Sequence, residues 1–590
     1  MENHTANARI ITRLMFKLLP VQVVLAAVSA VSGIVSSFFA SNYIGVEAMS
    51  AVGLYSPVNM LLTAISLMLQ SGSTVCCGKY MGRNRQDKLQ NVFSLSLVLC
   101  TIIGCMFAAL FLLLGLFDLT GFLTRDEAVR PLLDRYLLGQ AVGVLPLLLG
   151  NQLMAYLSLE NKGRVTMAAS LSYIFVNFLL DLLFVRYLHM GVFGLALASA
   201  LGLWAMLGVG SWRYLSGRSE LRCTVKNLEW REAGAIVSIG ISGALSNGYQ
   251  TVRGLIVNHL LLLYVGSVGV SAFAAADNLL RIFWAIPTGM VVVSRMLISV
   301  GIGEEDRRTV TDVMRVMLGR FVPLMACVSA LIILCAVPLT RLFFRDPSEP
   351  VYAMTVWGLR ILPLCMPLSI ICMHFTCYGD ASGKSGLVHT LSLLDGVVCV
   401  AGFTALLIPA VGMNSVYIAN VLNGVVTTLF IVGYAWVMRK RFPRDMDALL
   451  VLPTEFGVPP EARIDITVKD MEEVVTIARI VQGFCRDRGI DERRALLSGL
   501  ALEEMAGNVV EHGFVKDEKS HTIDVRVVHK NKDIILRLKD DCVPFDPGAR
   551  KTLTDTADPT KNIGIRMVFR LAKDVQYQSI LGLNVLTIKI

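Results

Sequence analysis

The sequence has few charged residues for its length. Only 17% of the 590 residues are charged, whereas a soluble globular chain has about 25%. The shortage is confined to one part of the chain, because 46 of the 99 Asp, Glu, Lys and Arg residues lie after position 441. Charged residues therefore make up about 12% of the first 441 positions and about 31% of the last 149. The first part is too apolar for a water-soluble core, and the last part is too polar to span a membrane.

Three further absences narrow the class of protein. None of the 13 cysteines belongs to a Cys-x-x-Cys pair, so we expect packed thiols and no metal or disulfide sites. We expect no cleavable signal peptide, because the first apolar run, 15–40, is longer than a signal h-region and suits a retained span. The net charge of +9 divides into +11 before position 442 and −2 after it. This division indicates basic loops beside a membrane and no nucleic-acid partner.

Apolar runs long enough to cross a bilayer recur up to residue 438. A helical span needs about 20 apolar residues, and Lys and Arg gather in alternate loops such as 79–88, 213–231 and 439–444. Because cytoplasmic loops carry this excess, we expect a multi-pass protein of the inner (plasma) membrane with both termini in the cytoplasm. The length criterion predicts about twelve spans, near 15–40, 50–75, 91–116, 132–158, 165–188, 191–213, 234–264, 270–302, 317–342, 353–378, 385–411 and 413–438.

A short internal repeat relates the two sets of six spans. Residues 43–51 resemble residues 264–272, an offset of 221, with Tyr, Gly, Ser and Ala in register. Six plus six spans in repeat are typical of a secondary transporter with its substrate cavity between two bundles. The expected domains are a cytoplasmic N-terminus (1–14), an N-terminal lobe (15–213), a linker (214–233), a C-terminal lobe (234–438), a second linker (439–461) and a soluble domain (462–590).

Two segments of the first half resemble a known transporter family. Residues 43–57, Tyr-Ile-Gly-Val-Glu-Ala-Met-Ser-Ala-Val-Gly-Leu-Tyr-Ser-Pro, are similar to the first-loop signature of the multidrug and toxic compound extrusion (MATE) family. Asn177-x-x-x-Asp181, followed by Gly191-x-x-Gly194-x-Ala196, is similar to its fifth and sixth spans. The resemblance implies cation-coupled export of organic compounds by alternating access between two six-helix lobes.

Asn177 and Asp181 are the candidate cation-coupling residues. A carboxylate within a span is costly and by default functional, and residues four apart project from one helix face. The pair is expected to coordinate Na⁺ through oxygens or to hold H⁺ on the carboxylate, and the resemblance places a cation site at these positions. An ion pair between Asp181 and Arg186 is the structural alternative. Other charges of the spans are expected to pair internally or to line the cavity: Arg253, Asp277, Arg281, Arg360 and Asp395.

The tail has the pattern of an α/β domain. Residues 463–468 alternate like a strand, and further strands are expected near 521–529, 533–539, 575–580 and 584–590. Helices are expected near 470–488, 491–513 and 563–572. The second of them carries Glu504, Asn508 and His512 at successive steps of four, and therefore along one face. The stripe indicates a site, with a solvated polar face as the alternative.

Three tail segments, in order, resemble the boxes of the histidine-kinase-like (GHKL) ATPase superfamily, specifically its anti-sigma-factor serine kinases. They are the stripe on the second helix, residues 540–547 after a strand, and residues 562–566 at the start of a helix. The resemblance implies a Bergerat-type sandwich that binds Mg-ATP. By residue, it implies that Asn508 holds Mg²⁺, Glu504 is the general base, Asp540 reads the adenine amine, Gly564 approaches the phosphates at a helix N-terminus and His512 supports the site.

The tail departs from that superfamily at two glycine positions. Cys542 and Asn562 stand where the boxes have glycine, and a side chain there can obstruct a nucleotide. The sequence therefore leaves open whether the tail binds nucleotide or has become a docking domain.

The fold class predicted from the sequence is a polytopic α-helical membrane protein with a cytoplasmic α/β sandwich. The first function it supports is a Na⁺- or H⁺-coupled antiporter for an organic small molecule, regulated by a nucleotide-binding or partner-binding tail. The alternative is a membrane-anchored signalling protein whose tail is a serine kinase or a switch for a cytoplasmic protein partner. Within transport, the alternative is a flippase for lipid-linked substrates. The repeat favours the first function, and the pair Glu504–Asn508 keeps the signalling alternative open.

Overall fold

A computed structural model gives the fold as two compact units. It describes residues 2–39, 43–44, 46–117, 129–217, 219, 221–224, 226, 228–341, 344, 346–514, 521–530, 533–543, 546–548, 563–580 and 582–590. The membrane unit comprises Met15–Glu304 and Met314–Val451, and the tail unit comprises Met1–Leu14, Glu305–Val313 and Leu452–Ile590. The motif residues Gly45, Pro544, Phe545 and Asn562 lie outside the described residues.

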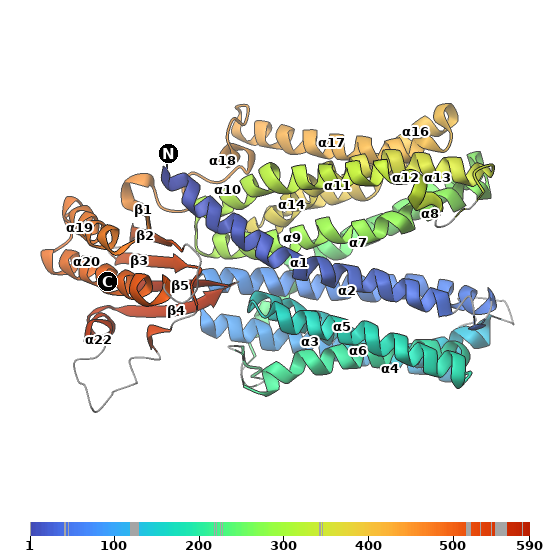
Figure 1. The fold of residues 1–590 in the computed structure, drawn as a ribbon, viewed down its shortest axis with the longest axis horizontal. Helices are drawn as coiled ribbons and strands as arrows, with labels where there is room; N and C mark the ends of the chain where they lie inside the picture. The colour runs from blue at the N-terminus through green and yellow to red at the C-terminus, as the bar shows by residue number, and fades with distance from the viewer. Residues whose placement is uncertain are drawn as a thin grey trace. The chain divides into compact units, whose positions relative to one another are not determined.

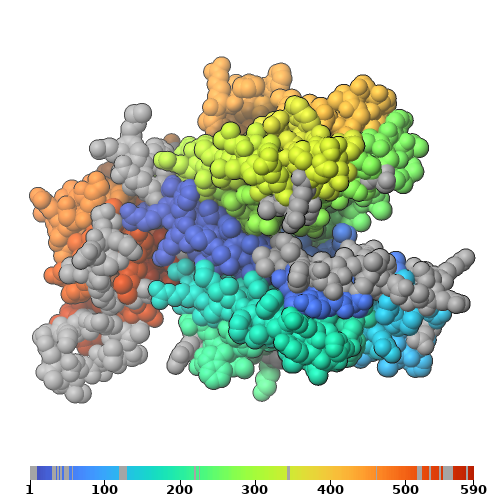
Figure 2. Space-filling view, turned by 45° about the vertical axis from the view of Figure 1, so that its right-hand side comes forward, coloured from blue at the N-terminus to red at the C-terminus, as the bar shows by residue number. Residues whose placement is uncertain are grey.

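Long helices build the membrane unit. In Figure 1, α2–α6 of the first half lie together in blue to teal, and α7–α17 of the second half lie together in green to orange. The space-filling view separates the same two sets (Figure 2). The first half comprises α1 (Glu2–Phe39), α2 (Val46–Gly82), α3 (Gln86–Leu116), α4 (Arg130–Leu159), α5 (Gly163–Asp181) with the π-helical η3 (Leu182–Tyr187), and α6 (Gly191–Leu215).

The second half repeats this succession with more interruptions. Its helices are α7 (Arg231–Tyr264), α8 (Ser267–Phe283), α9 (Ala285–Gly303), α10 (Arg307–Val316), η4 (Met317–Phe321), α11 (Val322–Leu334), α12 (Ala336–Arg341), α13 (Pro350–Ile361), η5 (Leu362–Cys365), α14 (Met366–Ser382), α15 (Ser385–Leu393), η6 (Leu394–Val398), α16 (Cys399–Val411) and α17 (Asn414–Arg439). The short α18 (Met446–Leu449) follows. In the second copy of the repeat, Tyr264 ends α7 and Gly266 precedes α8; Tyr43 and Ile44 of the first copy lie between α1 and α2.

Among the described residues, eleven helical runs are long and apolar enough to cross a membrane. Each overlaps one of the twelve spans predicted from the sequence, although the predicted span 270–302 is divided between α8 and α9 and only α9 is among the eleven. The other predicted span, 234–264, is the helix α7, which contains Asn247, Gln250 and Arg253 and is not among the eleven. The thirteen cysteines are all free, and most of them are buried.

The two halves meet through glycines of α2 and α7. A Cβ atom at Gly72 of α2 would lie 1.9 Å from the carbonyl oxygen of Ile236, and one at Gly240 of α7 would lie 1.9 Å from that of Met68. The backbones approach this closely because these residues lack a side chain. The contacts lie toward the end of α2 that precedes the basic loop 83–88, so the halves are packed against each other at the end predicted to be cytoplasmic.

The tail unit is an antiparallel sheet covered on one face by helices. The sheet order is β1-β2-β3-β5-β4, and α19, α20 and α22 lie on one side of it (Figure 1). The strands are β1 (Arg463–Val468), β2 (Ile523–Lys530), β3 (Asp533–Asp540), β4 (Asp574–Ile580) and β5 (Leu583–Lys589). The helices are η7 (Pro460–Ala462), α19 (Met471–Asp487), α20 (Glu492–Asn508), the π-helical η8 (Val509–Gly513) and α22 (Ile563–Leu571). This α/β sandwich confirms the predicted class of the tail.

Strand register separates an apolar inner face of the sheet from a charged outer face. Side chains alternate between the two faces along a strand. One row across four strands is Ile464, Val527, Leu536 and Ile588, which belong to the core under the helices. The next row is Asp465, Arg526, Arg537 and Thr587.

Candidate functional sites

The polar stripe predicted on α20 is present in the tail unit. The Asn508 side-chain amide donates to the Glu504 carboxylate at 3.0 Å and to the Glu504 main-chain oxygen at 2.6 Å. His512 follows one turn later, exposed, in η8. The chain therefore presents a carboxylate and an amide as a joined pair, which are oxygen ligands suited to Mg²⁺.

A pocket lies where this stripe faces the ends of the central strands. Asn508 and His512 line it together with Asp540 at the end of β3, and apolar side chains such as Met505, Leu538 and Leu586 complete the wall. The sequence therefore predicted three polar residues that the fold brings together. The pocket leaves about 30 Å³ of free volume, room for only a few water molecules, so a nucleotide base enters only if lining side chains move.

Asp540 is held at the base of the pocket by two strand partners. Its Oδ1 accepts hydrogen bonds from the Asn584 amide at 2.7 Å and from the Cys542 main-chain N–H at 3.0 Å. The Tyr577 hydroxyl donates to Asn584 at 2.8 Å. Burial raises the pKa of Asp540, and the hydrogen bonds from Asn584 and Cys542 oppose that rise. Asn584 and Tyr577 were not predicted as site residues, because the contact of Asn584 with Asp540, and that of Tyr577 with Asn584, follow from the pairing of β5 with β3 and β4.

Cys542 narrows the pocket beside η8. Its side chain is buried and lines the pocket, and a Cβ atom built at Gly513 would meet its sulfur at 3.3 Å. Cys542 is not among the described residues with positive φ, so an ordinary residue is tolerated there without backbone strain. The thiol takes up space in the pocket.

Gly564 permits a close contact between α22 and Glu504. A Cβ atom at Gly564 would lie 2.0 Å from the carboxyl carbon of Glu504, so only glycine fits here without displacing that side chain. Gly564 stands in the first turn of α22, where the helix dipole favours negative charge. The Glu504 carboxylate therefore lies at the N-terminus of α22, where the sequence analysis expects the phosphates of ATP.

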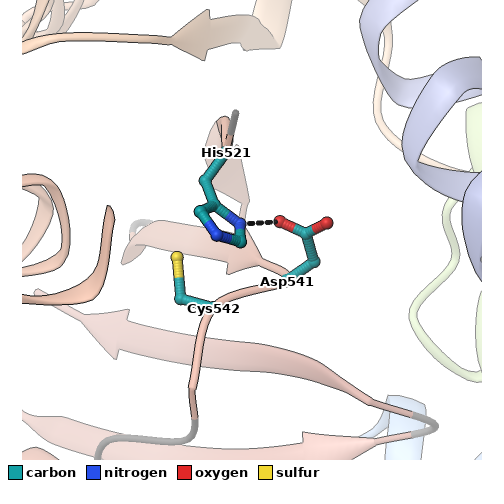
Figure 3. Close-up of side chains that lie close together, drawn as sticks. All are labelled: His521, Asp541 and Cys542. Carbon is teal, nitrogen blue, oxygen red and sulfur yellow. Dashed lines mark hydrogen bonds and ion pairs between the residues drawn. The ribbon is translucent and has the colours of Figure 1, made fainter. Parts of the chain in front are cut away.

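His521, Asp541 and Cys542 form a cluster at the rim of the pocket. Figure 3 shows the Cys542 thiol pointing toward the His521 ring, whose Nδ1 is 2.7 Å from Asp541 Oδ1. The three potential ligand atoms lie within 4.8 Å of one another. The other carboxylate oxygen of Asp541 is 3.0 Å from the guanidinium of Arg13. Asp541 therefore joins His521 and Arg13 through its two carboxylate oxygens.

In the membrane unit, Asn177 and Asp181 are buried together at the end of α5. The Asn177 amide donates to Asp181 Oδ2 at 3.2 Å and lies 3.3 Å from the Ser199 hydroxyl of α6. The second oxygen of Asp181, Oδ1, has no hydrogen-bond partner among the described residues. Gly202 lets α6 approach, since a Cβ atom there would lie 3.1 Å from the Cβ of Asn177.

The alternative ion pair of Asp181 is absent from the described residues. Arg186 lies over the rings of Tyr43 and Tyr187 and forms no ion pair with Asp181. Asp181 is thus a carboxylate that is fully buried yet has one oxygen free to accept a cation or a proton.

The other charges of the spans have different environments. Asp277 and Arg281 form the expected pair at 2.9 Å, exposed on α8. Asp395 accepts from the Asn423 amide at 2.8 Å. Sequence reasoning missed a further carboxylate, Asp380 in α14, which is buried and accepts from the Ser242 hydroxyl at 2.8 Å. Asp380 stands between Gly379 and Gly383 beside a loop, where no local pattern indicates burial.

Comparison with solved structures identifies the class of fold of the membrane unit. A MATE structure in complex with MaL6 and an outward-facing multidrug resistance MATE transporter each match with a TM-score of 0.68 and 20% identity. They cover 74% of this chain and 97% and 96% of theirs. A transporter of the MOP superfamily from Pyrococcus furiosus Vc1 (DSM3638) matches with a TM-score of 0.65 and 20% identity, over 74% of this chain and 96% of its own. At this identity the likeness shows the MATE fold.

Sequence comparison then establishes the family. The MatE family model matches residues 20–183 and again 239–429, which is more than half of the chain and agrees with the internal repeat. The chain belongs to the MatE family. The Multidrug export protein MepA of Staphylococcus haemolyticus (strain JCSC1435) is 22% identical over 375 residues, 63% of this chain and 82% of that protein. Residues 467–590 match the family described as Histidine kinase-like ATPase domain.

Proposed function

We propose that the protein is a cation-coupled antiporter that exports an organic small molecule and is regulated by its tail. The observation that carries the proposal is the buried Asp181 with its unpartnered Oδ1, beside Asn177 and Ser199. An ionised carboxylate with one oxygen unpartnered is costly in a membrane interior, whereas a bound Na⁺ or a proton removes that cost. Binding of either ion therefore changes the stability of the packing between α5 and α6. Ion binding must change the stability of the structure in this way if it is to be coupled to transport.

The other face of α5 supports an organic substrate. Its apolar and aromatic side chains, including Leu171, Ile174, Phe175 and Phe178, line an open hollow on that face. Sites for organic molecules are mostly apolar with few polar groups, and this face of α5 has that composition. Export by the relative MepA, as its name states, is consistent with such a surface. We propose that both termini face the cytoplasm of a plasma-membrane protein, as the basic loops indicate.

Dye efflux from vesicles with an imposed ion gradient tests this function. We expect Asp181→Asn to abolish gradient-driven efflux in a folded, inserted protein, because an amide neither exchanges a proton nor offers a charge to Na⁺. Asp277→Asn is the matched control, since that carboxylate is exposed and paired with Arg281. Separate Na⁺ and H⁺ gradients identify the coupling ion. Normal efflux by Asp181→Asn under both gradients would exclude the coupling role.

For the tail we propose that the pocket binds Mg-ATP as a regulatory ligand. Asn508 would hold Mg²⁺ beside Glu504, Asp540 would accept the adenine amine, and the α22 terminus at Gly564 would face the phosphates. The donor set fits the ligand, but Cys542 and the Glu504 carboxylate crowd it, so we expect weak binding. Bound ATP would supply a transferable phosphoryl group. Titration of the full-length protein with Mg-ATP measures the affinity, and Asn508→Ala should reduce it.

The intact pair Glu504–Asn508 also supports a second function, a serine kinase or partner switch directed at a cytoplasmic protein. A general base beside a metal ligand is the minimum that phosphoryl transfer to a hydroxyl requires. Incubation of the full-length protein with radiolabelled ATP and a cytoplasmic extract would reveal labelled protein that Glu504→Gln fails to produce. Binding of ATP without any labelling would leave a purely regulatory tail.

A further inference from the structure

The charged outer face of the tail sheet is covered by a segment that precedes a membrane helix. Glu305–Val313 belongs to the tail unit, yet α10 begins at Arg307 and continues through η4 into α11 as one run, Arg307–Leu334, apolar enough to span a membrane. Because the chain is continuous, a restraint on residues 305–313 also acts on the membrane-spanning run Arg307–Leu334.

Asp306 has two roles in this segment. Its Oδ1 accepts the main-chain N–H groups of Arg308 at 3.0 Å and Thr309 at 3.1 Å, and its Oδ2 accepts the Thr309 hydroxyl at 2.7 Å. Asp306 thus caps the N-terminus of α10. The same carboxylate lies 2.6 Å from the guanidinium of Arg526 and 3.6 Å from the Lys539 ammonium.

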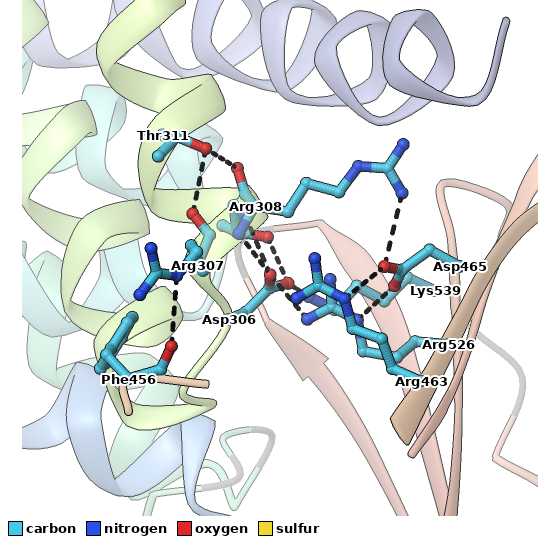
Figure 4. Close-up of polar contacts among 10 residues, drawn as sticks. Asp306, Arg307, Arg308, Thr311, Phe456, Arg463, Asp465, Arg526 and Lys539 are labelled. Atoms are coloured by element: carbon cyan, nitrogen blue, oxygen red, sulfur yellow. Dashed lines mark hydrogen bonds and ion pairs between the residues drawn. The ribbon is translucent and has the colours of Figure 1, made fainter. Parts of the chain in front are cut away.

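Arg526 ties this helix cap to the sheet. Its Nε donates to Asp465 of β1 at 2.6 Å, and Figure 4 shows Arg308 extending from α10 toward the same carboxylate, at 3.9 Å. Only 9% of Arg526 and 3% of Asp306 is exposed. Burial raises the pKa of Asp306, but the charges of Arg526 and Lys539 lower it further, to well below the usual range. Both partners therefore stay charged and little screened, so breaking the contact is costly.

One strand joins this contact to the nucleotide pocket. Along β3 and the residue after it, Lys539 faces Asp306, Asp540 lines the pocket, and Asp541 pairs with Arg13 of α1 at 3.0 Å. Neighbouring residues of a strand point to opposite faces but share one backbone. A shift of Asp540 on ligand binding therefore also moves Lys539 and Asp541. α1 is also continuous from the tail unit into the membrane unit.

We propose that the end of β3, residues 539–541, transmits occupancy of the tail pocket to the capped first turn of α10, with Arg526 and Asp306 as the essential contact and Arg13 of α1 as a second one. This inference rests on the proposed regulatory function of the tail. Arg526 and Asp306 are positioning residues and touch no ligand.

Hydrogen exchange of the full-length protein in lipid nanodiscs tests the inference, with Mg-AMP-PNP as the probe. In the wild type we expect the probe to change the exchange of the 305–313 peptide, which contains the capped amides. Arg526→Met should raise that exchange roughly tenfold without probe, because a charged hydrogen bond is lost, and should abolish the response to the probe. Asp306→Asn keeps a capping oxygen, so it should lose the response with a smaller rise.

Arg486→Met is the matched control, because Arg486 pairs with Glu492 on the exposed helical layer. It should leave the 305–313 peptide unchanged. A fluorescent nucleotide shows in parallel that each variant still binds. If wild type and Arg526→Met both bind the nucleotide and the exchange of the 305–313 peptide responds equally in both, the inference is wrong but the regulatory role of the tail is not affected. Lack of binding by the wild type overturns both the inference and the regulatory role of the tail, whereas a failure of efflux in every variant removes only the transport function.

Discussion

Gly240→Ala tests whether the glycine contacts between α2 and α7 hold the two halves together at the predicted cytoplasmic end. The added methyl group would lie 1.9 Å from the carbonyl oxygen of Met68. That oxygen belongs to a helix backbone, so it cannot move aside alone, and the helices must separate by roughly 1 Å. Overpacking of this kind costs about 1–3 kcal/mol. The cost arises only when the two halves are packed together at α2 and α7. We therefore expect the state in which they are separated there to gain about 5–150-fold in population.

The matched control is Gly243→Ala, one turn along the same helix, where nothing lies within 4 Å of an added Cβ atom. Both substitutions raise helix propensity by up to about 1 kcal/mol, so their comparison isolates the clash. The assay is maleimide labelling of the full-length protein in nanodiscs, with peptide mapping of Cys76. This buried residue lies one turn from Gly72 on the same face of α2. We expect faster labelling in Gly240→Ala alone. Equal rates in the two variants would refute the reasoning.

Two further predictions concern the tail. Burial raises the pKa of Asp524 to about 6, against the opposing charge of Lys539. Between about pH 4 and 6, the folded tail therefore keeps a proton on Asp524 that the unfolded chain has released. The stability of the tail should fall as pH rises through that window. Urea unfolding monitored by hydrogen exchange at pH 4.5 and 7 should show this dependence, and Asp524→Asn should flatten it. Cys542→Gly should tighten binding of Mg-ATP by about 1–3 kcal/mol by relieving overpacking, measured by calorimetry on the full-length protein. Asn508→Ala in that background should remove the gain, and an unchanged affinity in Cys542→Gly would show that the thiol is not the obstacle.

Local and periodic features of the structure were predictable from sequence. The helical runs follow from apolar stretches of fixed length, and the tail strands follow from alternation, because both patterns depend on residues close along the chain. The pairing of Asn508 with Glu504 follows from one helical turn. The main difference in the spans is α7, which is helical but contains polar residues that lower its hydropathy.

Contacts between distant segments depended on the tertiary structure. Asn584 reaches Asp540 only because β5 pairs with β3, and Asp380 is buried only because α14 packs beside Ser242 of α7. Asp306 appears in the sequence as part of an ordinary charged loop. Its contact with Arg526 joins residues 220 positions apart.

The sequence by itself determined the classes of the two parts and predicted their repeat and the candidate residues of both sites, because these depend on composition and local spacing. The tertiary structure decided that Asp181 has no ion-pair partner among the described residues, that Cys542 narrows the pocket and that the segment 305–313 lies on the outer face of the tail sheet. Burial and partnership arise from long-range packing, which no local pattern encodes.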